Sequence, residues 1–102
     1  MKLIQKLSDM IEEELQDARK YVRCALEHKD GHPDLARTFA NLSNQEMDHA
    51  QILHSAVVDL INEYRNQHGD PPERMRAVYD FLHQRQLDEA TEIRVMQEMF
   101  RR

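Results

Sequence analysis

The segment Lys29-Asp30-Gly31-His32-Pro33 decides the fold, because it interrupts an otherwise uniformly helical sequence. Glycine favours the end of a helix and proline is accepted in the first turn of the next, so this segment predicts a tight turn between two helices. His68-Gly69-Asp70-Pro71-Pro72 repeats the combination further along the chain. The two breaks predict three helices, at about residues 3–28, 34–67 and 73–100.

The composition between the breaks indicates an all-α fold. The 102 residues include only 2 Gly, 3 Pro and no Trp, and are rich in helix formers such as Leu, Met, Ala, Glu, Gln, Lys and Arg. The sequence shows no internal repeat and no linker, so we expect one domain, residues 1–102. A domain of this size has a thin core.

Charge and hydropathy limit the classes of partner. The net charge of -5 comes from interleaved acidic and basic residues, which form no basic stripe for nucleic acid or anionic lipid. No window approaches the roughly 20 apolar residues of a membrane span. The first ten residues also lack the apolar segment of a secretory leader, so we expect a soluble, cytoplasmic protein. Cys24 is the only cysteine, which excludes an internal disulfide and a cysteine-based zinc or iron centre.

Each expected helix carries an apolar stripe at helical period. The stripe of the first helix comprises Leu7, Ile11, Ala18, Tyr21 and Ala25. The stripe of the second comprises Leu35, Phe39, Leu42, Leu53, Ala56, Val57 and Leu60. The stripe of the third comprises Met75, Val78, Tyr79, Leu82, Ile93, Met96 and Phe100. The second helix would be about 50 Å long at 1.5 Å per residue, too long to cover its own stripe. We therefore expect a homo-oligomer, at least a dimer.

Three polar residues interrupt these stripes: Glu14 in the first helix, and Glu46 and His49 in the second. A carboxylate in an apolar seam costs several kcal/mol unless it is paired, protonated or bound to a cation. An antiparallel hairpin centred near Gly31 places Glu14 opposite residue 48, between the other two. Glu and His three residues apart can both reach one metal ion in front of their helix. A donor set of carboxylate and imidazole suits Fe(II), Mn or Zn, whereas Mg and Ca prefer oxygen alone.

Two motifs resemble those of the ferritin-like superfamily, in its rubrerythrin-like branch. They are Glu14-x-x-Asp17-Ala18-x-x-Tyr21 and Glu46-x-x-His49-Ala50-x-x-Leu53. In that family, one Glu from each of two helices and a Glu-x-x-His pair from each of two others complete a di-iron site. The chain has one such Glu and one such Glu-x-x-His pair, which is half of that ligand set. The resemblance to small encapsulated ferritins therefore implies a four-helix di-metal bundle completed by dimerisation. The implied ligands are Glu14, Glu46 and His49, with two Fe per dimer and Glu46 as the bridging carboxylate.

The resemblance implies ferroxidase-type oxidoreduction, with Fe(II) and O2 or peroxide as reactants. It does not extend to the four-cysteine iron module of rubrerythrins. It also does not extend to the cargo tail of encapsulated ferritins, because the chain ends at Phe100-Arg101-Arg102 in helical sequence. We therefore do not expect an encapsulin shell as a partner.

Several alternatives remain open at the level of the sequence. Glu89 and Glu92 on the third helix are either additional ligands or part of a solvated acidic patch. Tyr21 is either a redox-active neighbour of the site or a core tyrosine. His54 and His83 lie off the stripes and are expected at the surface. For the whole protein, the alternatives to a ferroxidase are a non-catalytic metal-stabilised bundle and a metal-free interaction module in which Glu14 and Glu46 pair with arginines.

Overall fold

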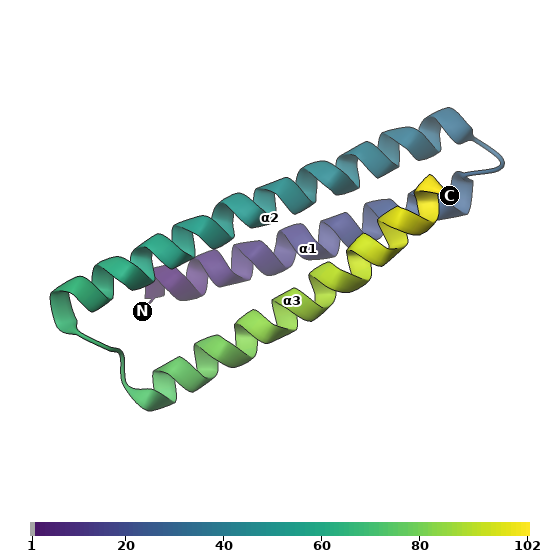
Figure 1. The fold of residues 1–102 in the computed structure, drawn as a ribbon. Coiled ribbons are helices and arrows are strands. Elements are labelled where there is room, and N and C mark those ends of the chain that lie inside the picture. The colour runs from purple at the N-terminus through teal and green to yellow at the C-terminus, as the bar shows by residue number, and fades with distance from the viewer. Residues whose placement is uncertain (1) are drawn as a thin grey trace.

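The computed structural model describes residues 2–102, which form three helices joined by two short turns. The helices are α1 (Lys2–His28), α2 (Pro33–His68) and α3 (Glu73–Arg101). Their bounds confirm the predicted ranges to within one residue at every end. The chain runs up, down and up, so that α3 lies parallel to α1 and antiparallel to α2 (Figure 1). The result is a rod of 55 × 18 × 18 Å.

Both turns form as the glycine and proline pattern predicts. Pro33 occupies the first turn of α2, and the N–H of Ala36 donates to the carbonyl of His32 at 2.9 Å. At the far end, Gly69 adopts φ +76°, a left-handed conformation that side chains disfavour. Its N–H donates to the carbonyl of Arg65 at 2.9 Å, which closes α2. These caps fix where the long hairpin of α1 and α2 turns and where α3 begins.

Small side chains occupy several of the buried positions between α1 and α2. The fully buried residues of α2 include Ala36, Ser43 and Ala50, spaced seven residues apart. On α1, Ala18 and Ala25 are completely buried as well. A small side chain lets two helix backbones approach closely, and the larger Ile11, Leu15 and Met47 are buried beside these positions in the central core cluster. Ile93 is the α3 residue that completes the central core cluster.

This arrangement corrects part of the predicted core. None of the seven stripe residues predicted for α2 is fully buried, and Leu35 is 45% exposed. Val78 of α3, also predicted to face inward, is 50% exposed. The buried residues of α2 are Ala36, Ser43, Met47 and Ala50. They lie on the side of α2 that α1 and α3 cover, next to the side that carries the predicted stripe.

The uncovered side of the hairpin has a regular pattern. Two series of residues, spaced alternately four and three apart, run along it, and none of their members is fully buried. The α1 series, here called the open seam of α1, comprises Leu3, Leu7, Met10, Glu14, Asp17, Tyr21, Cys24 and His28. The α2 series, the open seam of α2, comprises Leu35, Phe39, Leu42, Glu46, His49, Leu53, Ala56 and Leu60. Ring contacts of Phe39 with Tyr21 and His28, each with centroids 6.3 Å apart, place the two seams side by side.

No helix within residues 2–102 combines the length and the apolar character required to cross a membrane.

Candidate metal centre

A hydrogen bond between α1 and α2 sets the register that positions the candidate ligands. The hydroxyl of Ser43 donates to the carbonyl of Ala18 at 2.7 Å, in the buried part of the hairpin. Moving four residues back along α1 and four forward along α2 places Glu14 level with residue 47. The expected level was residue 48, so the structure confirms that Glu14 faces the Glu46–His49 turn.

The three predicted ligands converge. His49 Nδ1 lies 3.5 Å from Glu14 Oε2 and 3.7 Å from Glu46 Oε2. One donor atom from each residue lies within 4.8 Å of the other two. These separations are longer than ordinary hydrogen bonds of about 2.7–3.2 Å. The donor atoms therefore gather around one point without satisfying one another.

Glu14 Oε2 provides the test of whether these residues fit a metal ion. This oxygen is buried and has no hydrogen-bond partner. A buried polar atom without a partner is costly, more so when it carries charge. A cation among Glu14, Glu46 and His49 would satisfy it, and carboxylate with neutral imidazole is a donor set suited to Fe(II), Mn or Zn. The residues present therefore fit a transition-metal ion.

The centre opens to one side of the hairpin. The side chain of His49 is 53% exposed, whereas those of Glu14 and Glu46 are 27% and 18% exposed. All three lie on the open seams, on the side of the hairpin that α3 leaves uncovered. The chain thus supplies one side of a metal site, with apolar seam residues above and below it.

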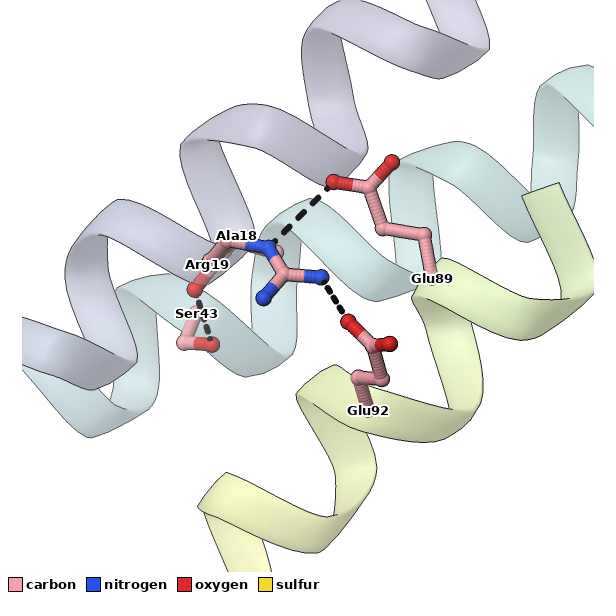
Figure 2. Close-up of polar contacts among 5 residues, drawn as sticks. All are labelled: Ala18, Arg19, Ser43, Glu89 and Glu92. Carbon is pink, nitrogen blue, oxygen red and sulfur yellow. Dashed lines mark hydrogen bonds and ion pairs between the residues drawn. The ribbon is translucent and has the colours of Figure 1, made fainter. Parts of the chain in front are cut away.

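Glu89 and Glu92, considered as additional ligands, are held elsewhere. Figure 2 shows both carboxylates turned toward the guanidinium of Arg19 on α1. The Arg19–Glu92 contact is 2.6 Å long and the Arg19–Glu89 contact 3.4 Å. Hydrogen bonding to Glu92 is the main reason that the pKa of Arg19 is raised. The two glutamates therefore fasten α3 to α1 and do not join Glu14, Glu46 and His49.

A buried polar chain behind the centre was not predicted from the sequence. The hydroxyl of Ser43 donates to the carbonyl of Ala18, as Figure 2 shows. Gln97 Nε2 in turn donates to the hydroxyl of Ser43 at 2.9 Å. This chain joins all three helices one turn away from Glu46. The signal that sequence reasoning passed over is the seven-residue spacing of Ala36, Ser43 and Ala50, which marks the close helix contact better than the large apolar residues do.

Tyr21 is placed on the open seam. Its ring stacks on Phe39, with the ring planes 22° apart. It does not belong to the group of converging donor atoms found within residues 2–102. The structure thus favours an aromatic packing role over a direct ligand role.

Comparison with known proteins identifies the family of the chain. Neither a search of curated proteins nor a search of solved structures gave a match. A family model described as Rubrerythrin matches residues 6–102, a stretch that contains the central core cluster and every candidate ligand. This chain therefore belongs to the rubrerythrin family, a di-iron family of the ferritin-like superfamily.

Proposed function

We propose that two copies of the chain pair through their open seams and hold two iron ions between them, where Fe(II) is oxidised by O2 or peroxide. The ligands are Glu14, Glu46 and His49 of each copy, which together provide four carboxylates and two imidazoles. The observation that carries this proposal is the buried, unpartnered Oε2 of Glu14 facing His49 from across the hairpin.

The shape of the chain supports pairing. Apart from His28 at the end of α1, the open seams are apolar away from the ligands. Their alternating spacing of four and three is the pattern of helices that pack in left-handed bundles. A second hairpin on this side would bury Leu42, Leu53 and the Tyr21–Phe39 stack. It would also complete a ligand set of which one chain holds half. The same contact thus covers the apolar residues and supplies the missing donors.

The residues of the chain have distinct tasks in this chemistry. Two iron ions, when bound, would supply two electrons, because each metal changes its oxidation state by one. Glu14 and Glu46 would hold the metal ions and offset their positive charge. His49 binds as a neutral imidazole. In the proposed dimer, the second hairpin would cover the open side of the centre and limit the access of water.

The test is an anaerobic Fe(II) titration of metal-free protein, with mass measured in solution, followed by exposure to O2 while the ferric absorbance is recorded. The proposal expects two Fe per dimer and rapid oxidation. Glu46→Gln should lose iron binding. Asp48→Asn is the matched control, because Asp48 is an exposed acidic residue of the same helical turn outside the donor group, and it should behave as the unaltered chain does.

The same donor set supports a second candidate, a non-catalytic bundle stabilised by metal. Carboxylate and imidazole bind Zn and Mn as well as Fe, so tight zinc binding without redox change would favour this candidate. The metal-free interaction module has less support. It requires arginine partners for Glu14 and Glu46, and among the described residues the only ion-pair partner of either is His49. Arg19, the nearest such candidate by sequence, is engaged by Glu89 and Glu92.

A further inference from the structure

Two histidines outside the candidate metal centre meet between α2 and α3. The rings of His54 and His83 stack with their centroids 4.9 Å apart and their planes 14° apart. The expectation that both lie at the surface is wrong for His54, which is partly buried beneath α3. Because two imidazolium ions would repel each other at this distance, the stacked pair favours neutral rings. Neutral imidazoles carry the nitrogen lone pairs that metal ions bind.

The histidine pair borders open space within the bundle. A cavity of about 240 Å³ lies between the three helices and includes Ser8 of α1 in its wall. A second cavity of about 190 Å³ is bordered by the same two histidines. The other charged side chains at these walls are Asp80 in the first cavity and Arg94 in the second, both from α3. The site thus has room for a hydrated ion and a carboxylate beside the imidazoles.

Asp80 supplies a third donor. It precedes His83 by three residues, which is the spacing of Glu46 and His49, so carboxylate and imidazole leave α3 about one turn apart. Asp80, His83 and His54 all line the larger cavity. Their donor atoms do not converge as closely as those of the candidate metal centre, so binding would draw the Asp80 carboxylate toward the two rings.

We propose that His54, His83 and Asp80 bind a second divalent transition-metal ion, of the zinc class, that clamps α2 to α3. Two imidazoles and one carboxylate form a donor set found in zinc sites and suit Co(II) and Ni(II) as well. Burial, followed by the charge of His83, lowers the pKa of His54, which keeps its ring available to a metal near neutral pH. The inference is independent of the proposed ferroxidase activity, because the two sites share no residue.

The experiment uses full-length protein carrying E46Q and H49Q, which disable the candidate metal centre. Zinc is titrated into this variant by calorimetry, and Co(II) is added separately so that its visible absorption reports the ligand geometry. We expect about one zinc per chain to remain bound. Adding H83Q should abolish this binding and the Co(II) absorption. H68Q is the control, because His68 stacks on Tyr64 near the end of α2, away from the cavities, and should change neither.

Loss of all zinc binding in the E46Q/H49Q protein would overturn the proposal, as would binding that persists after H54Q or H83Q. Circular dichroism of each variant checks that the helices are intact. A second measurement avoids the double-variant background: H83Q alone should lower the zinc stoichiometry of the otherwise unaltered chain by one per chain. Iron titration of the same H83Q protein should be unchanged, so failure of this site is distinguishable from failure of the proposed function.

Discussion

His49 on α2 lies 3.5 Å from Glu14 on α1, measured from Nδ1 to Oε2, and nothing else within residues 2–102 satisfies that carboxylate oxygen. The contact crosses the hairpin, so it depends on the register of two helices and not on local sequence spacing. It is also too long for a good hydrogen bond. The pair is therefore arranged as two donors around a common point, and its energetics should change with metal.

Replacing Glu14 by Gln tests the energetic cost of burying this carboxylate without metal. The metal-free protein should become more stable by about 1 kcal/mol, because a partly buried carboxylate whose Oε2 has no hydrogen bond is replaced by a neutral amide. Iron binding should be lost in the same variant. Urea unfolding with and without chelator measures the first effect, and iron titration measures the second. Glu13→Gln, at the exposed neighbouring position, should show neither change. Retained iron binding in Glu14→Gln would remove this residue from the site.

Replacing Leu42 by Arg tests the open seam as the pairing surface. Leu42 lies one turn before Glu46, and a charge there should prevent a second hairpin from packing against it. We expect a shift from dimer to monomer in sedimentation, together with weaker iron binding. Ile52→Arg is the matched control, because Ile52 is 67% exposed and lies outside the seam. A monomeric control, or a Leu42→Arg protein that still pairs, would contradict the proposed interface.

Replacing Glu89 and Glu92 by Gln separates the α3 carboxylates from the metal site. Iron stoichiometry should be unchanged, because Arg19 and not the Glu14 cluster holds both. The free energy of unfolding should fall by roughly 0.5–1 kcal/mol, since these partly exposed ion pairs are screened by solvent. Chemical denaturation at low and high salt measures this loss, which should shrink as salt is added. A reduced iron stoichiometry would indicate that Glu89 or Glu92 binds iron after all.

Acidification should weaken the metal-free protein through His54. Burial and the facing His83 hold the pKa of His54 below its ordinary value of 6.5. The unfolded chain therefore binds the proton more readily, so stability is complete above about pH 6.5 and falls as the pH drops toward the folded pKa. Across that range, His54→Gln should flatten the dependence of melting temperature on pH in the presence of chelator. His68→Gln should leave the slope as it is, and an identical slope in both variants would rule out this role for His54.

Local sequence signals were sufficient for the helices and for the level of the ligands. Gly31 with Pro33, and Gly69 with Pro71 and Pro72, place the turns. Glycine accepts backbone conformations that other residues disfavour, and proline fixes φ and lacks an N–H, whatever the surrounding sequence. Once the first turn was placed, the position of Glu14 opposite Glu46 and His49 followed from helical rise alone. The site could therefore be located without knowledge of the core packing.

Packing between helices was harder to predict. Sequence reasoning assigned apolar residues at helical period, such as Leu35 and Val78, to the interior, yet both are about half exposed. Several buried positions between α1 and α2 instead hold small residues, including Ser43, whose hydroxyl reaches the carbonyl of Ala18. Two further contacts, the ion pairs of Arg19 and the stacking of His54 on His83, depend on how α3 packs against the hairpin. The hydrophobic periodicity of a single helix does not specify this packing.

The regular spacing of the open seams has a consequence for assembly. A seam that repeats every seven residues fits a partner seam equally well after a slip of one repeat, so apolar side chains alone leave the alignment of two copies ambiguous. Glu14, Glu46 and His49 interrupt both seams at one level. In the proposed dimer, a slipped pairing would press these charges against leucines, at a cost of several kcal/mol. The ligands would then specify the register of the dimer, so that the two copies align in one position before any metal binds.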